Sequence, residues 1–150
     1  MGRVTSRYRF DLPNDDWFIG ETPDGYDFIV ARRGAFDTFR PNIGATTIPV
    51  AAGTALSTVM EQSAHATREK SHNFRVTDGP DDAGRQTLSF SVAASFGELE
   101  LTQHQAFYAV AGDEGEDRVL CVVMSAASRD AGELVGDFNA FLGSLRFDDA

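Results

Sequence analysis

The sequence predicts an α+β domain in which an antiparallel sheet carries two helices. Most of the apolar residues lie in short runs or alternate with polar residues at period two, and turn-forming residues separate these runs. Helical spacing of apolar residues occurs in only two places, over residues 54–70 and 129–143. A chain of 150 residues without repeats or linkers fits a single domain over residues 1–150 that can bury a real core.

The strands are predicted one by one from alternation and from turn residues. Tyr8, Phe10 and Leu12 share one face of a strand that ends at Pro13, because proline lacks the N–H that a ladder needs. Further strands are expected over residues 17–19, 28–30, 42–48, 74–76, 88–94, 99–110 and 119–124.

The 119–124 run is continuously apolar, which predicts a central strand covered on both faces. Cys121 lies inside this run, so it is expected to be a structural core residue with a raised thiol pKa. Trp17 stands beside two further apolar residues and is also expected in the core.

Both helices carry start signals. Thr54 is the expected N-cap of the first helix. The strand that follows this helix, over residues 74–76, is expected to end in a turn at residues 78–80. Asp130 and Glu133 give the second helix a capping-box-like start, and Gly143 is suited to end it.

Charge and hydropathy exclude several classes of function. With 23 acidic against 13 basic residues the net charge is −10, and such a field repels the phosphate backbone, so nucleic acid is not an expected partner. No stretch approaches the roughly 18 apolar residues of a membrane span. The N-terminus is polar, and the chain is expected to be soluble and cytoplasmic. Twelve arginines against the single Lys70 are typical of a high-GC bacterium.

The chain carries no recognisable catalytic or metal-binding pattern. Its single cysteine excludes an intrachain disulfide. His65, His72 and His104 lack the spacing of a zinc site, and none has an evident serine or cysteine partner. The acidic 113–117 segment lacks the ligand spacing of a calcium loop and is expected to be a solvated hairpin tip. We therefore predict no catalytic residue, metal or cofactor.

Residues 34–40 form an irregular stretch that is a candidate for partner binding. Phe36 and Phe39 would be apolar anchors and Arg40 their charged neighbour, which are residue types favoured at interfaces. The alternative is that one or both rings pack beneath the loop as a small satellite cluster.

A pocket between sheet and helix is the second candidate site. Phe90, Gln103 and Tyr108 would line it and would serve a small-molecule binder or an unrecognised enzyme. Gln103, His104 and Gln105 place polar groups on an otherwise apolar strand, where they would line a groove or face solvent.

The order of parts resembles the Mog1/PsbP-like fold group, in particular its bacterial branches with the actinobacterial LpqN/LpqT lipoproteins and the DcrB-like domains. The residues that carry this resemblance are, in chain order, the segment 8–13 with Trp17, Asn42-Ile43 before a helix, Gly84-Arg85 opening a hairpin, Gln103 on its return arm, and the closing segment 141–145.

The resemblance implies an α/β/α sandwich with a central antiparallel sheet and no shared active site. Members of the group act as binders: one engages a nuclear-transport GTPase, one supports the oxygen-evolving complex, and some are chaperones for secretion effectors. A non-enzymatic protein-binding, adaptor or chaperone-like role is therefore expected. The protein partner would be secretion- or envelope-associated, and the domain a monomer or homodimer. The lipoprotein relatives carry a signal and a lipidated cysteine that this sequence lacks.

Overall fold

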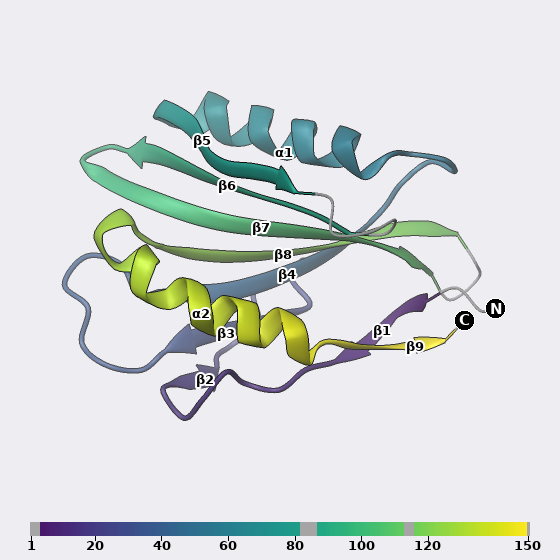
Figure 1. Cartoon of the computed structure of the whole chain (residues 1–150), viewed down its shortest axis with the longest axis horizontal. Helices are drawn as coiled ribbons and strands as arrows, with labels where there is room; N and C mark the ends of the chain where they lie inside the picture. The colour runs from purple at the N-terminus through teal and green to yellow at the C-terminus, as the bar shows by residue number, and fades with distance from the viewer. Residues whose placement is uncertain (1–3, 82–86, 113–115, 150) are drawn as a thin grey trace.

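The structure, a computed structural model, describes residues 4–81, 87–112 and 116–149. Within these ranges the chain forms one nine-stranded sheet and two helices (Figure 1). Gly84, Arg85 and the centre of the acidic 113–117 segment lie outside the described residues. The elements are β1 (Val4–Arg9), β2 (Trp17–Ile19), β3 (Phe28–Arg32), β4 (Asn42–Pro49), α1 (Leu56–Lys70), β5 (His72–Asp81), β6 (Thr87–Phe96), β7 (Leu99–Ala111), β8 (Asp117–Ala127), α2 (Ser128–Ser144) and β9 (Arg146–Asp149).

The sheet is antiparallel along its main path. The strands follow the order β2-β3-β4-β8-β7, and β6 and β5 continue beyond β7. β1 joins β7 in parallel, and β9 pairs antiparallel with β1. Gly97, with φ +65°, and Glu98 connect the paired residues Phe96 and Leu99. This two-residue turn fixes the register of β6 with β7.

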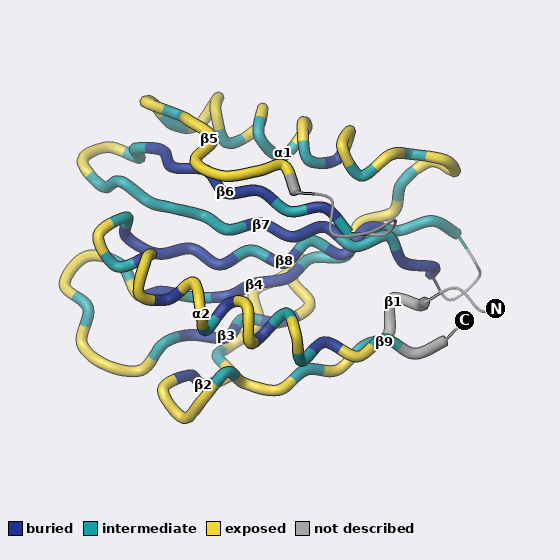
Figure 2. Tube along the Cα trace, in the orientation of Figure 1, coloured by how far each residue is buried: buried dark blue, intermediate teal, exposed yellow. Residues whose placement is uncertain are grey.

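The two helices pack on opposite faces of the sheet, which makes the predicted α/β/α sandwich. The core under α1 consists of Val59, Phe90, Val92, Phe107 and Val119. The larger core under α2 includes Val30, Ile43, Leu120, Val122, Met124, Leu134, Phe138 and Phe141. Figure 2 shows the buried residues concentrated in the central strands, β6, β7, β8 and β4. Successive side chains along a strand point to opposite faces of the sheet, so the strands contribute residues to both cores.

The central strand β8 is covered unequally on its two faces. Leu120, Val122 and Met124 are fully buried on the α2 side, but Cys121 and Val123 on the α1 side are only half-buried. The reason is that α1 packs on β5, β6 and β7. On the α1 side the prediction of a covered strand is confirmed at Val119, which is 1% exposed, and is wrong at Cys121 and Val123.

The helix starts differ from the predicted caps. Thr54 donates its hydroxyl to the Ala51 carbonyl at 2.6 Å, and Ala55 occupies the N-cap position of α1 without a side-chain cap. Helix α2 has Ala127 at its N-cap position, so Asp130 lies inside the first turn. There its carboxylate interacts favourably with the helix dipole instead of capping the helix.

Asp137 of α2 ties the β2–β3 hairpin to the rest of the domain. Its carboxylate accepts hydrogen bonds from Trp17 Nε1 at 2.9 Å and from Arg32 Nη1 at 3.1 Å. Asn14 Nδ2 donates to the same carboxylate at 3.2 Å. Trp17 is 1% exposed, which confirms its predicted place in the core.

β5 and β8 (Asp117–Ala127) extend beyond their predicted bounds, and β9 is a strand that the sequence did not predict. β5 continues past the expected 78–80 turn to Asp81, and its pairing with β6 shifts between Val76 and Asp78. β9 forms directly after α2, where the sequence shows no strand pattern of its own, and it is completed by pairing with β1.

Candidate functional site

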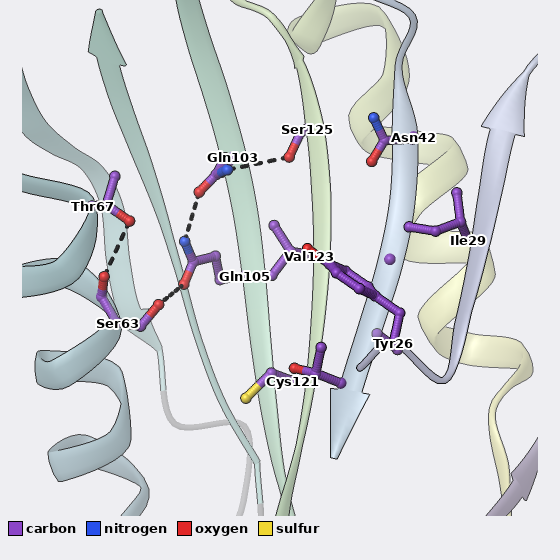
Figure 3. A pocket seen from close by; sticks show the side chains of 13 residues that line it. Tyr26, Ile29, Asn42, Ser63, Thr67, Gln103, Gln105, Cys121, Val123 and Ser125 are labelled. Carbon is purple, nitrogen blue, oxygen red and sulfur yellow. Dashed lines mark hydrogen bonds between the residues drawn. The ribbon is translucent and has the colours of Figure 1, made fainter. Parts of the chain in front are cut away.

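A groove lies on the α1 side of the sheet, where α1 leaves the strands uncovered (Figure 3). Its volume is about 210 Å³. Ser63 and Thr67 of α1 form one wall, and Tyr26 and Ile29 form the other. The remaining lining residues, on β4, β7 and β8, are Asn42, Gly44, Ala45, Thr46, Gln103, Gln105, Cys121, Val123 and Ser125. We call this site the neutral groove.

Strand register brings the floor of the neutral groove together. Ser125 of β8 lies between Asn42 of β4 and Gln103 of β7, because it pairs with both. Val123 pairs in the same way with Gly44 on one side and with Gln105 on the other. Residues two apart on a strand share a face, so these rows form one continuous surface.

A chain of hydrogen bonds crosses the floor from α1 to β8. Ser63 Oγ donates to Gln105 Oε1 at 3.0 Å. Gln105 Nε2 donates to Gln103 Oε1 at 2.9 Å, and Gln103 Nε2 donates to Ser125 Oγ at 3.3 Å. Figure 3 shows these bonds as one line across the strands. We call this set of four side chains the amide relay.

The wall opposite α1 depends on a glycine. A Cβ atom at Gly44 would lie 2.8 Å from Ile29 Cδ1 and 3.2 Å from Tyr26 Cε2, so both side chains pack directly over this residue. The segment that carries Tyr26 is held to β4 by the hydrogen bond from Asp27 N to the Ala45 carbonyl, at 2.8 Å. Tyr26 remains 46% exposed and forms the outer rim.

None of the thirteen described residues that line the groove carries a charged side chain. Burial raises the pKa of the Cys121 thiol to about 11, although a hydrogen bond with Thr46 lowers it in part. The thiol is therefore protonated at neutral pH and is not an activated nucleophile. Cys121 lines the groove and also packs against the core under α1, in line with its predicted core role.

The predicted partner-binding residues form a self-contained loop between β3 and β4. Arg40 Nη1 donates to the Arg32 carbonyl at 2.6 Å and to the Gly34 carbonyl at 2.8 Å. Its guanidinium lies 5.6 Å from the centroid of the Phe36 ring. Phe36 and Phe39 are both half-buried, which is intermediate between the two alternatives of exposed anchors and buried rings.

The structure does not bring the three predicted pocket residues together. Gln103 lines the neutral groove. Phe90 is 4% exposed and belongs to the core under α1. Tyr108 points to the α2 side, where its ring packs against Phe147 at 5.6 Å, and burial raises its pKa to about 12.

One histidine has a serine partner that the sequence interpretation missed. Ser91 Oγ lies 2.5 Å from His104 Nδ1, on the α2 side of the sheet. The statement that no histidine has such a partner is therefore wrong. A signal was present, because the two-residue turn at Gly97 and Glu98 places Ser91 opposite His104 once the hairpin is zipped.

Two further observations concern the described residues. They contain no group of three or more His, Cys, Asp or Glu side chains placed to hold a metal ion. In the same ranges, neither helix combines the length and the apolar character that crossing a bilayer requires.

Comparison with solved structures identifies the fold. LpqN of Mycobacterium tuberculosis, described as involved in cell envelope biogenesis, has 15% sequence identity and a TM-score of 0.68. The match covers 94% of this chain and 84% of LpqN. The chain has a Mog1/PsbP-like fold. PsbP of Synechocystis sp. PCC 6803 is also similar, with 10% identity, a TM-score of 0.55, and coverage of 99% of this chain and 94% of that chain.

The Mog1/PsbP-like fold confirms the architecture expected from the order of parts. No protein-family profile and no curated protein sequence matches the chain. The resemblance to DcrB-like domains stays a prediction. At such low identity the likeness concerns the fold, so function has to be argued from the site itself.

Proposed function

We propose that this protein is a non-enzymatic protein-binding domain, adaptor- or chaperone-like, that holds an uncharged, extended segment of a partner in the neutral groove. The observation that carries this proposal is a lining of thirteen uncharged residues in a chain with a net charge of −10. An ionised ligand group would lose hydration in the groove without meeting a counter-charge. Segments without charges are therefore favoured.

The amide relay supplies the hydrogen bonds that such a segment needs. Gln103 and Gln105 each use one N–H and one carbonyl lone pair within the relay. A side-chain amide has two of each, so the half-buried Gln103 keeps one donor and one acceptor for a ligand. Gln105 is 3% exposed and orients Gln103. An extended peptide presents N–H and C=O groups in alternation, which matches this set, while Ile29 and Val123 offer apolar contacts to its side chains.

The 34–40 loop adjoins one end of the neutral groove. Asn42 lines the groove, and its Nδ2 donates to the Arg40 carbonyl at 3.2 Å. A partner segment that leaves the groove at this end would meet Phe36 and Phe39 next. We therefore propose these two rings and the exposed Arg40 as a second contact region for the same partner.

The size of the groove favours a peptide over the alternative, a small-molecule binder or enzyme. Sites for drug-sized ligands occupy roughly 300–1,000 Å³, whereas the neutral groove measures about 210 Å³. That volume suits a few side chains of a bound segment.

Similarity of fold to LpqN supports a partner associated with the cell envelope. LpqN is described as involved in cell envelope biogenesis, and both similar structures fit a non-enzymatic role. We propose an envelope- or secretion-associated protein as the partner, bound by a monomer or homodimer of this domain. The cytoplasmic location expected from the sequence stays a prediction.

Site-specific photo-crosslinking in cells tests the proposal. Tyr26→p-benzoylphenylalanine places the photoreactive group at the rim of the groove, and Glu133→p-benzoylphenylalanine places it on exposed α2 on the opposite face. We expect a crosslinked protein from position 26 that is missing from position 133, with the crosslink mapped to an uncharged segment. Identical crosslinks from both positions would contradict the proposal.

A synthetic peptide of the crosslinked segment then tests the groove chemistry by calorimetry. Gln103→Ala removes a relay member and should weaken binding by about threefold to tenfold, the value of one or two hydrogen bonds. Gln62→Ala makes the same change at an exposed position of α1 and should leave binding unaltered. Equal binding by all three proteins would exclude the amide relay as the recognition element.

A further inference from the structure

A second opening lies on the opposite face of the sheet, between α2 and the strands β5, β6 and β7. Its volume is about 280 Å³. The residues that matter for its chemistry are Asp78, Ser89, Ser91, His104, Phe138 and Asn139. We call this opening the His104 cavity. It opens on the other face from the neutral groove, because His104 alternates with Gln103 and Gln105 along β7; of the described residues, Gln105 lines both openings.

A row of three side chains from three neighbouring strands forms the floor of the His104 cavity. Asp78 of β5 pairs with Ser91 of β6, and Ser91 pairs with His104 of β7. Ser91 is 7% exposed, and its Oγ lies 2.5 Å from His104 Nδ1. The imidazole also stacks on Phe138 of α2, with 6.1 Å between ring centroids and 26° between planes. The ring is thus fixed from two sides.

A glycine brings Asp78 to the mouth of this cavity. Gly79 has φ +90°, and a Cβ there would lie 2.8 Å from the Ser89 carbonyl oxygen and 2.9 Å from Phe90 Cα. Only glycine permits both this backbone conformation and this close approach of β5 to β6. The position of Asp78 is therefore built into the strand pairing.

The charges around His104 favour a cationic ligand. Asp78 is the charged residue among the described lining, and the α2 residues that line the cavity, Val135, Phe138, Asn139 and Leu142, are uncharged. Burial lowers the pKa of His104, an effect that Asp78 opposes in part. At neutral pH the imidazole is therefore uncharged. Within the described residues its Nε2 makes no hydrogen bond, so it is available to a ligand.

A metal site and a nucleophilic serine explain the row less well. One carboxylate and one imidazole fall short of the three or four ligands of a protein zinc site. Strand β6 pairs with a neighbour on each side, so its N–H groups point along the sheet and do not form an oxyanion hole in the cavity.

We propose that the His104 cavity binds a small primary amine with a short apolar tail. The ammonium group would pair with the Asp78 carboxylate and share hydrogen bonds with His104 and Ser89, and the tail would contact Phe138 and Leu142. This proposal is independent of the peptide function, since it uses the other face of the sheet.

Titration with n-butylamine tests the proposal, by calorimetry and by ¹H–¹⁵N NMR at pH 8. We expect shifts at Ser91, His104 and Asn139 and none at Tyr26 on the rim of the neutral groove. n-Butanol and butyrate, of similar size, should bind at least about tenfold more weakly, because a charge-assisted hydrogen bond is lost. Equal binding of butanol, or shifts confined to the neutral groove, would overturn the proposal.

Two matched variants test whether the Asp78 carboxylate binds the ammonium group. Asp78→Asn should weaken butylamine binding by about tenfold or more. Asp24→Asn removes the same charge from an exposed position between β2 and β3 and should have no effect. Equal affinities of these two variants would contradict the proposal, and because both positions are exposed, folding is not at risk.

The pH dependence of butylamine affinity tests whether the His104 imidazole takes part in binding. Protonated His104 would repel the ammonium group and compete for Asp78, so affinity should fall by about tenfold from pH 8 to pH 5. His104→Gln should flatten this profile while the Asp78 contribution persists. A wild-type profile that is itself flat would rule out His104 as a ligand-binding group.

Discussion

The neutral groove and the His104 cavity open on opposite faces of one sheet, and their chemistry is opposite too. The groove is lined by amides, hydroxyls and apolar groups. The cavity holds a carboxylate and an imidazole. Both arise because each helix covers only part of its face: α1 packs on β5, β6 and β7, and α2 on β7 and β8. Offset helices thus give a three-layered sandwich an opening on each face of the sheet, and β7 contributes to both.

The largest effect should come from the core that supports both openings. Phe141 is fully buried and packs against Phe10 and Phe28, with ring centroids 4.9 and 5.7 Å away. Phe141→Ala should lower the free energy of unfolding by about 3–5 kcal/mol, measured by urea denaturation. Val123→Ala, at a half-buried groove position, should cost about 1 kcal/mol. Similar losses for both variants would show that the groove side is packed as tightly as the α2 side.

A smaller change should close one opening only. Gly44→Val places a side chain where Tyr26 and Ile29 now pack, so we expect a cost of about 1–3 kcal/mol from overpacking and loss of peptide binding. Butylamine binding in the His104 cavity should be retained. Gly136→Ala is the control, since a Cβ there meets nothing within 4 Å. If Gly44→Val abolished both kinds of binding, the two openings would not be separate.

Cys121 reports on the groove through its reactivity. Because burial raises its pKa to about 11, alkylation by iodoacetamide should be slow at pH 8 and should accelerate up to about pH 11. Thr46→Val should slow the reaction further, since loss of the Thr46 hydrogen bond raises the pKa again. The urea-unfolded protein gives the reference rate. A folded rate that already levels off near pH 8.5 would contradict the buried environment.

The smallest expected effect is the pH dependence of the free energy of unfolding that His104 causes on the α2 side of the sheet. His104 has a folded pKa below its ordinary value of 6.5, so the unfolded chain takes up a proton more readily. The free energy of unfolding should therefore fall as the pH falls below about 6.5. Asp78→Asn should steepen this loss, because Asp78 raises the pKa of His104. Urea denaturation at pH 5 and pH 8 measures it, and a shallower pH dependence in Asp78→Asn would refute the assignment.

The sequence predicts local features well where alternation and burial agree. The strand around Leu88 and the apolar stripe of α2 follow directly from period two and period 3.6. The strand around Val119 follows from its continuous apolar run. The cap at Thr54 fails because its hydroxyl donates to the Ala51 carbonyl instead, a competition that a residue pattern does not rank. The cap at Asp130 fails because α2 already begins at Ser128.

The sites depend on long-range contacts that no local pattern contains. Tyr26 meets Gly44 only after β3 has paired with β4, and Ser63 meets Gln105 only after α1 has settled over β7. The predicted pocket fails to assemble because Gln103 and Tyr108 lie on opposite faces of β7. An odd separation along a strand predicts this outcome.

The amide relay gives the neutral groove a direction that can reverse. Every donor from Ser63 to Ser125 points the same way, and turning over one amide forces the other to turn as well. The amide relay can therefore donate its hydrogen bonds in either of two directions, and a mixture of the two directions is not stable. Because both directions keep all three hydrogen bonds, a bound peptide would turn both glutamines together. The groove can therefore adapt its donors and acceptors to either N-to-C direction of its ligand.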